Sequence, residues 1–160
     1  MFPSIHDIKL AYRLTEDYSR RFFPYIPYKR LLTTVSEIDE VHGEISERQK
    51  RWSDWFDVKG FAQPTEITQP VTQFSMEDIR ELELAISVPD LVNAGLAAQD
   101  PNTYLVSTIS GPGDHIKYGS ELREYEIVTF VPAARFANTD LVLYYQAHCV
   151  LYRPESTDYI

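Results

Sequence analysis

A strict alternation of apolar and polar side chains between Arg80 and Val88 constrains the fold of this chain more than any other stretch. One set of alternate positions is apolar throughout, namely Leu82, Leu84, Ile86 and Val88. The other set is acidic at Glu81 and Glu83 and small at the next two positions. A period of two is typical of a β-strand with one face in the core and the other in solvent. The stretch therefore predicts a half-buried strand.

The same period recurs twice in the second half of the chain. In residues 124–131 the shared face carries Tyr125, Ile127, Thr129 and Val131. In residues 141–152 it carries Leu141, Leu143, Tyr145, Ala147, Cys149 and Leu151. Residues 132–140 predict a connecting loop, because they are too polar for a core and too many for a tight hairpin turn. With shorter strand-like runs at 56–61 and 104–109, the prediction is a mainly β protein, a small antiparallel β-barrel or sandwich over residues 55–153.

One short helix is predicted at residues 89–94, directly after the first of these strands. Pro89 suits the first turn of a helix, Asp90 follows it, and Gly95 suits the position after the last turn. Residues 62–70 are punctuated by prolines and predict a loop.

The first 54 residues are predicted to form an N-terminal helix and an extended arm. Residues 3–23 have a partly helical period with Ser4 or Asp7 as the cap, and Pro24 and Pro27 end the helix. The aromatic segment 22–28 then predicts an extended conformation. Either its side chains cover the edge of the core, or the segment is an arm that docks on a neighbouring subunit. Residues 154–160 are predicted to be a C-terminal tail.

The net charge of −9 is distributed unevenly along the 160 residues. Residues 1–60 hold 10 Lys and Arg against 10 Asp and Glu, whereas residues 61–160 hold 5 against 14. An acidic β domain argues against gripping nucleic acid through its phosphates, although DNA could pass close by without being held. Cys149 is the single cysteine, which excludes an internal disulfide and favours a reducing compartment. The sequence indicates neither a signal peptide nor a membrane-spanning run.

No catalytic, metal-binding or cofactor-binding residues are predicted, and we expect the protein not to be an enzyme. His148 and Cys149 are adjacent and therefore point to opposite faces of a strand, which prevents a nucleophile–base pair. The other histidines lie in different elements without metal-ligand spacing. The carboxylate pairs Glu81/Glu83 and Glu124/Glu126 have the residue type that hydrolases use. Charge on exposed strand faces is the commoner reason for such pairs.

Aromatic side chains beside cations are the best candidates for a binding surface. Trp52 and Trp55 lie close to Arg48, Lys50 and Arg51 in the sequence, and tryptophan and arginine are enriched at interface hot spots. The alternative is that both tryptophans anchor the first strand in the core. Tyrosine, with 11 copies, also suits assembly surfaces. The candidate interface residues are Phe22, Phe23, Tyr25, Tyr28, Arg48, Arg51, Trp52, Trp55, Phe56, Tyr144 and Tyr152.

Three stretches of the β domain carry a resemblance to a known family. They are Arg80–Leu91 with Gly95, then Gly113–Val128, then Phe136–Tyr145. Their order of strands and turns resembles that of tailed-bacteriophage neck proteins of the head-closure, or stopper, kind, although Asp140 stands where the family has a proline. The resemblance covers about residues 55–153. It implies a β-barrel subunit that assembles into a ring of six or twelve copies.

The resemblance also implies a place and a set of partners. The ring would sit in the neck of the virion, after synthesis in the host cytoplasm, with a portal or adaptor protein on the head side. A tail or tail-terminator protein would lie on the other side. DNA would pass through the channel without tight specific binding, and neither a cofactor nor a membrane would be involved. The alternatives are a tail-side completion or terminator protein of the same virion, a monomeric β-barrel binding module, and a carboxylate-dependent hydrolase.

Overall fold

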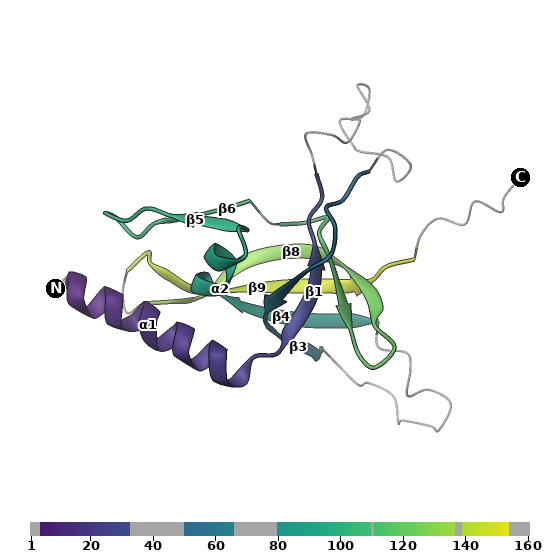
Figure 1. Cartoon of the computed structure of the whole chain (residues 1–160), viewed down its shortest axis with the longest axis horizontal. Coiled ribbons are helices and arrows are strands. Elements are labelled where there is room, and N and C mark those ends of the chain that lie inside the picture. Colours follow the sequence, from purple (N-terminus) through teal and green to yellow (C-terminus); the bar gives the residue numbers. More distant parts are fainter. Residues whose placement is uncertain (1–3, 33–49, 66–79, 110, 137–138, 154–160) are drawn as a thin grey trace, which may run out of the picture.

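The computed structural model describes residues 4–32, 50–65, 80–109, 111–136 and 139–153. Its helices are α1 (Ile5–Phe22) and α2 (Val88–Asn93). Its strands are β1 (Tyr25–Lys29), β2 (Phe56–Lys59), β3 (Phe61–Pro64), β4 (Glu81–Ser87), β5 (Ala97–Gln99), β6 (Val106–Thr108), β7 (His115–Tyr118), β8 (Arg123–Arg135) and β9 (Val142–Leu151) (Figure 1). The prediction of a mainly β protein with a short helix near residue 90 is confirmed. No described helix combines the length and the apolar character that crossing a membrane requires.

Seven strands form one antiparallel sheet in the order β2-β1-β7-β8-β9-β4-β3. The two edge strands are consecutive in the sequence, because only Gly60 separates β2 from β3. β2 pairs with β1 and β3 pairs with β4, so the segment 56–64 supplies both edges of the sheet. Among the described strands β2 and β3 do not pair with each other, so the sheet is not closed into a barrel. Its two edges instead come together at Gly60.

Gly60 allows the chain to pass from one edge of the sheet to the other. A Cβ atom placed there would lie 3.0 Å from Leu84 Cδ1 and 3.3 Å from the carbonyl oxygen of Ala85. Any side chain at this position would therefore push against β4. The prediction of a loop from residue 62 was wrong for β3, because the four residues after Gly60 pair with β4 despite ending in a proline. Proline is tolerated at the end of an edge strand, where its missing N–H is not needed.

The core lies on the inner face of the sheet and follows the alternation in β4. Leu82, Leu84 and Ile86 are buried, and Val88 continues the buried set into α2. Burial of each large aliphatic side chain contributes about 1.5–3 kcal/mol relative to exposure. β4 lies between β3 and β9, so its inner face is covered by neighbours on both sides. The predicted half-buried strand is therefore confirmed, except that Ser87, predicted on the solvent face, is also buried.

The alternation in β8 changes part of the way along the strand. Tyr125 and Ile127 are buried as predicted. The register with β9 then shifts at a bulge between Ile127 and Thr129, and Phe130 packs on Tyr145 with ring centroids 5.1 Å apart. An extra residue at a bulge turns the following side chains to the other face. The prediction that Thr129 and Val131 face the core was therefore wrong.

β8 is also longer than the sequence predicts. It continues through Pro132 to Arg135, where residues 132–140 were predicted to be a loop. Beyond residue 126 the described sheet pairs β8 with β9 but not with β7, so this half of β8 has one free edge. A proline fits such an edge.

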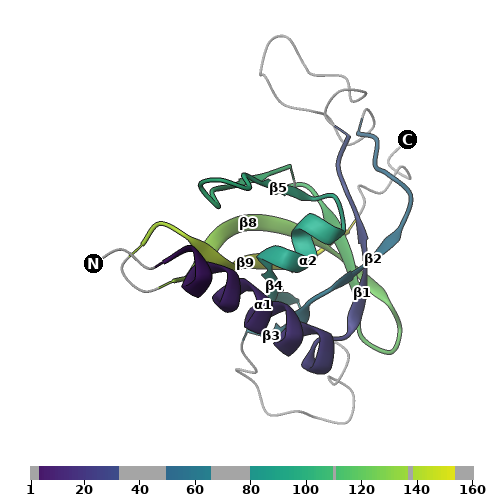
Figure 2. The ribbon, with the colours of Figure 1, turned by 60° about the vertical axis from the view of Figure 1, so that its left-hand side comes forward.

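Both helices are capped by serine side chains, of which Ser4 was predicted and Ser87 was not. In α1, the Ser4 side chain accepts a hydrogen bond from the Asp7 backbone, and Asp7 accepts one in return, which is a capping box. In α2, Ser87 accepts from the backbone of Asp90, and Gly95 follows with φ of 77°. α1 packs against α2 and strands β4 and β9 (Figure 2). β5 and β6 pair as a separate two-stranded sheet, of which only β6 was predicted.

The N-terminal segment is extended, as predicted, but it does not form an arm outside the β domain. Residues 25–29 are β1, which is hydrogen-bonded between β2 and β7 inside the main sheet. Ile26 and Tyr28 point into the core and are buried. The predicted boundary at residue 54 therefore cuts through one continuous sheet. The predicted tail, 154–160, lies outside the described residues.

Candidate functional site

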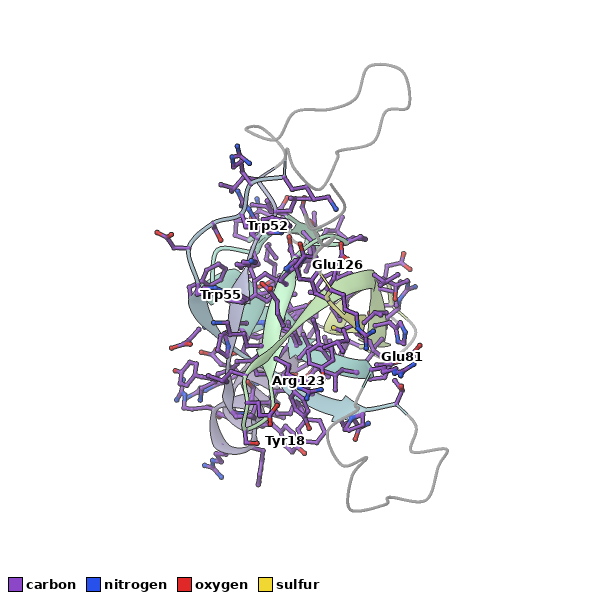
Figure 3. The ribbon with its side chains drawn as sticks, turned by 90° about the vertical axis from the view of Figure 1, so that its right-hand side faces the viewer. Tyr18, Trp52, Trp55, Glu81, Arg123 and Glu126 are labelled. Carbon is purple, nitrogen blue, oxygen red and sulfur yellow. The ribbon has the colours of Figure 1, made fainter. Side chains whose placement is uncertain are left out.

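Two groups of aromatic residues lie at different ends of the molecule. The first, the Trp52 cluster, consists of Lys29, Trp52, Trp55, His115 and Tyr152. The second, the Phe22 cluster, consists of Tyr18, Phe22, Phe23, Phe61 and Tyr144. In Figure 3, Trp52 lies near the upper end of the described chain and Tyr18 near the lower end. The candidate interface residues are therefore divided between two surfaces.

The Trp52 cluster covers the outer face of the sheet around His115. The imidazole lies between the rings of Trp52 and Tyr152, with centroid distances of 4.8 Å and 4.4 Å. The Trp52 indole N–H donates to the carbonyl oxygen of Gly113 at 3.1 Å, and the Trp52 backbone bridges to Leu31. His115 is fully buried as a result, although its strand position faces away from the main core. Trp52 thus packs within its own subunit and is half-buried.

The environment of His115 favours the neutral imidazole. Burial lowers the pKa of His115, and the nearby Glu124 carboxylate acts in the opposite direction. Nδ1 lies 3.2 Å from Glu124 Oε1 without the direction of a hydrogen bond, and Nε2 has no hydrogen-bond partner among the described residues. A protonated imidazole would therefore carry an N–H at Nε2 for which the described residues provide no acceptor.

Lys29 connects the buried part of the Trp52 cluster to its exposed part. Its Nζ lies 2.6 Å from Glu124 Oε1. Partial burial of Glu124 tends to raise its pKa, but the neighbouring Lys29 ammonium and His115 imidazole together outweigh burial and lower it. The same ammonium lies 4.7 Å from the ring centroid of Trp52 and 4.9 Å from that of Trp55. Lys117 approaches Trp55 to 4.5 Å, so Trp55 is held between two cations while remaining exposed.

Tyr28 and Asp114 form a buried support beneath the Trp52 cluster. Asp114 accepts hydrogen bonds from Tyr28 Oη at 2.5 Å, the Leu31 backbone at 2.8 Å and the Gly111 backbone at 3.0 Å. Burial raises the pKa of Asp114, and these hydrogen bonds act in the opposite direction. Tyr28 is 1% exposed, so its prediction as an interface residue was wrong. Its hydroxyl instead bonds to Asp114, which holds the backbone of Leu31 and Gly111. Phe56 packs against Tyr28 and is half-buried.

The Phe22 cluster is open to solvent. Tyr18 contacts Phe22 and Phe23, with ring centroids 4.7 Å and 5.8 Å apart. Phe23 contacts Phe61 at 6.0 Å and Tyr144 at 6.2 Å. Phe22 is nevertheless 64% exposed. The Phe22 cluster therefore contains three of the sequence candidates, Phe22, Phe23 and Tyr144.

A hollow of about 280 Å³ adjoins the Phe22 cluster, between the end of α1, strands β1 and β3, and the β7–β8 turn. We call it the Tyr25 groove; its walls include Phe22, Tyr25, Phe61, Lys117, Tyr118 and Leu122. Tyr25, Phe61 and Leu122 are exposed at its rim. Sequence reasoning identified Tyr25 and Phe22 but missed Tyr18, Phe61 and Leu122. The spacing of Tyr18 and Phe22 with Leu10 and Leu14, four residues apart along α1, was an available signal.

A second hollow, of about 440 Å³, has charged walls. It lies between α1, α2 and strands β1 and β2, and Glu16, Arg20, Asp57, Lys59 and Asp90 line it. Several of these groups already have partners within the chain. Arg20 pairs with Glu16 at 3.4 Å, Lys59 donates to the Arg20 carbonyl at 2.9 Å, and Asp90 accepts from Ser87 at 2.6 Å.

The carboxylate pairs are tied to neighbouring side chains. Glu83 accepts from Gln146 at 2.8 Å and lies 3.1 Å from His148 Nδ1. Glu81 lies 3.7 Å from His148 Nε2, and Glu126 lies 3.9 Å from Lys50. Within the described residues, no group of three His, Cys, Asp or Glu side chains is placed to hold a metal ion.

The remaining residues that the sequence singled out are Cys149, His148, Arg51 and Arg48. Cys149 is fully buried, and burial raises its thiol pKa to about 12. His148 lies opposite Glu83 in the register and is partly exposed, so the two neighbours face opposite ways as predicted. Arg51 is exposed. Arg48 lies outside the described residues.

The chain was compared with family models, curated protein sequences and solved structures, and none of them matches it.

Proposed function

We propose that this protein is a structural subunit of a tailed-phage neck, of the head-closure or connector kind. Six or twelve copies form a ring between a portal or adaptor protein on the head side and a tail or tail-terminator protein on the other. The ring lines or seals the DNA channel after packaging. The protein acts in the virion and has no catalytic role.

The observation that carries this proposal is the exposed aromatic surface formed by the Phe22 cluster and the Tyr25 groove. Phe22, Tyr25 and Phe61 are large, neighbouring and exposed. Contiguous apolar surface of this kind on a small chain marks an interaction site, and aromatic side chains dominate the energetics of interfaces. A protein that assembles needs such a surface on every subunit.

The arrangement of the resembling stretches also supports the proposal. They contribute β4 with α2, β7 with β8, and the first part of β9. These strands are neighbours in the sheet, in the order β7-β8-β9-β4. The resemblance therefore concerns one contiguous part of the fold.

The charge is compatible with a channel through which DNA slides. The net charge of −9 disfavours tight phosphate binding, because affinity for DNA depends on neutralising phosphates with cations. We expect no sub-micromolar DNA complex in a gel-shift measurement with the full chain at physiological salt.

The test is the assembly state of the purified full chain. Light scattering at about 100 µM, where associations with micromolar Kd are populated, should give six or twelve times the mass of one chain. Electron microscopy of the same sample should show rings with a central opening. A monomer at this concentration contradicts the proposal. Binding to a portal or adaptor, and not to the tail alone, separates a head-closure protein from a tail-side terminator.

A monomeric binding module is the second candidate, because the Tyr25 groove could accept an apolar segment of another protein. Such a module needs one groove and no self-association. The same light-scattering measurement distinguishes the two functions.

A further inference from the structure

We infer that the Tyr25 groove binds a second copy of this chain, and that the part of the second copy bound there is the acidic outer face of β4 and β9. The contact is head-to-tail: the groove of one subunit packs on the outer face of the next. This inference rests on the proposed function, since it names the surfaces through which the ring would form.

The apolar surface at the groove is continuous over several elements. Tyr18, Leu14 and Leu10 extend it from Phe22 along α1 at intervals of four residues, and all of them are exposed. This flank lies beside the face of α1 that packs inward, which carries Tyr12, Thr15 and Ser19. The helix thus turns partly polar residues inward and leaves an apolar flank in solvent. In the other direction the groove wall continues with Lys117, whose ammonium lies 4.5 Å from the ring centroid of Trp55.

Three cations lie around this surface. Lys117 is in the groove wall, Lys59 lies 5.0 Å from the ring centroid of Tyr25, and Arg21 is exposed in the last turn of α1. Two grooves facing each other in a symmetric pair would bring these like charges together. Like charges across an interface are unfavourable, so a groove-to-groove dimer is disfavoured.

The outer face of β4 and β9 has the opposite sign. Glu81 and Glu83 project from β4 there beside His148. Glu126 follows on β8, where Lys50 lies 3.9 Å from it. Glu81 remains 55% exposed in its side chain. In Figure 3, Glu81 lies toward the right-hand edge of the described chain and Tyr18 toward its lower end. Complementary surfaces on different sides of one subunit produce a head-to-tail contact, which closes into a ring when the rotation allows.

The test exchanges charge between the two surfaces of the full chain. Lys117→Glu makes the groove less basic, and Glu81→Lys makes the outer face less acidic. Each variant alone should associate at least about tenfold more weakly than the unaltered chain in sedimentation velocity at low salt. An equal mixture of the two variants should regain association, because the new carboxylate in the groove of one variant then meets the new ammonium on the outer face of the other.

Controls separate this interface from other outcomes. Tyr25→Ala should weaken association, whereas Val92→Ala, at an exposed apolar position on α2, should not. Far-UV circular dichroism and thermal unfolding of every variant check that the subunits are folded. If Glu81→Lys associates like the unaltered chain, the outer face is not the counterpart and the inference is wrong.

The result also distinguishes this inference from the proposed function. Rings that form regardless of both charge variants and of Tyr25→Ala overturn the inference and leave the proposed function standing. A chain that stays monomeric under all conditions overturns both, and shows that the groove serves a different protein.

Discussion

The Trp52 cluster and the Phe22 cluster use the same kinds of side chains but end in opposite states. In the Trp52 cluster, rings, a lysine and a carboxylate meet one another, and they enclose His115 completely. In the Phe22 cluster, the rings also contact one another, but Phe22 remains 64% exposed. Aromatic and basic composition therefore does not by itself identify an interface. What matters is whether the chain supplies partners for those side chains.

The physical origin of the difference is the backbone around each cluster. Trp52 is held by its hydrogen bond to Gly113 and by the bridge to Leu31, so its position is set on two sides. Phe22 lies at the end of α1, where the chain turns into β1, and its side chain is mostly in solvent. We expect the first cluster to contribute mainly to folding stability and the second mainly to association.

The largest effect should come from removing the support of the closed cluster. Asp114→Ala removes the carboxylate that accepts hydrogen bonds from the Tyr28 hydroxyl and from two backbone N–H groups. We expect a loss of about 3 kcal/mol in the free energy of unfolding, measured with urea. Asp114→Asn keeps one acceptor oxygen and should cost about half as much. Equal stability of Asp114→Ala and the unaltered chain would show that the cluster does not depend on this support.

The two tryptophans offer a matched comparison within one cluster. Trp52→Ala should lower the free energy of unfolding by about 2–3 kcal/mol, because it removes a half-buried ring and a hydrogen bond. Trp55→Ala should cost less than about 1 kcal/mol, since its ring is more exposed and its contacts are with lysines. Urea unfolding of both variants decides the order. A reversed order would make Trp55 the structural residue.

A smaller effect concerns pH and the buried imidazole. The lowered pKa of His115 means that the unfolded chain binds the proton more readily than the folded chain. Its contribution to stability is complete above the ordinary value of about 6.5 and declines as pH falls from there through the lowered folded value. Glu124, Lys29 and Glu126 are the charged groups that act on it.

The measurement is the urea midpoint between about pH 7.5 and pH 5, above the range in which ordinary carboxylates titrate. His115→Phe keeps a ring between Trp52 and Tyr152 but cannot titrate, so its midpoint should change less over the same range. An identical pH slope in both proteins would assign the dependence to a different group.

The smallest effect on folding should come from the open cluster. Phe22→Ser should change the free energy of unfolding by no more than about 0.5 kcal/mol, because the side chain is already mostly in solvent. Self-association in light scattering should nevertheless weaken. A large loss of stability without any change in association would place Phe22 with the structural aromatics and remove the contrast between the two clusters.

Much of the fold could be predicted from local patterns. The alternation at 80–88 predicted β4 and its buried face, and Ser4, Pro89 and Gly95 marked the ends of helices correctly. The predictions that failed depend on neighbouring strands. A bulge opposite β9 reversed the faces of Thr129 and Val131, and pairing with β4 made residues 61–64 a strand despite a proline.

The candidate surface was predicted only in part. The sequence identified Phe22, Tyr25 and Trp55 as aromatic residues close to cations, but it grouped them with Tyr28 and Trp52. Only the fold separates these residues, because it buries Tyr28 beneath Trp52 and brings Phe61 and Leu122 to the rim of the Tyr25 groove.

The sequence by itself determined the mainly β class, the identity of the inward-facing residues of β4, the helix caps and the excess of acidic charge after residue 60. The acidic excess follows from composition. The other properties follow from local periodicity and backbone preferences, which act within a few residues. The tertiary structure alone decided that β1 joins the main sheet, that the two edges of this sheet meet at Gly60, and that His115 is buried on the outer face of the sheet. Those outcomes depend on contacts between residues far apart in the chain, such as Tyr28 with Asp114 and Trp52 with Gly113, which no local pattern contains.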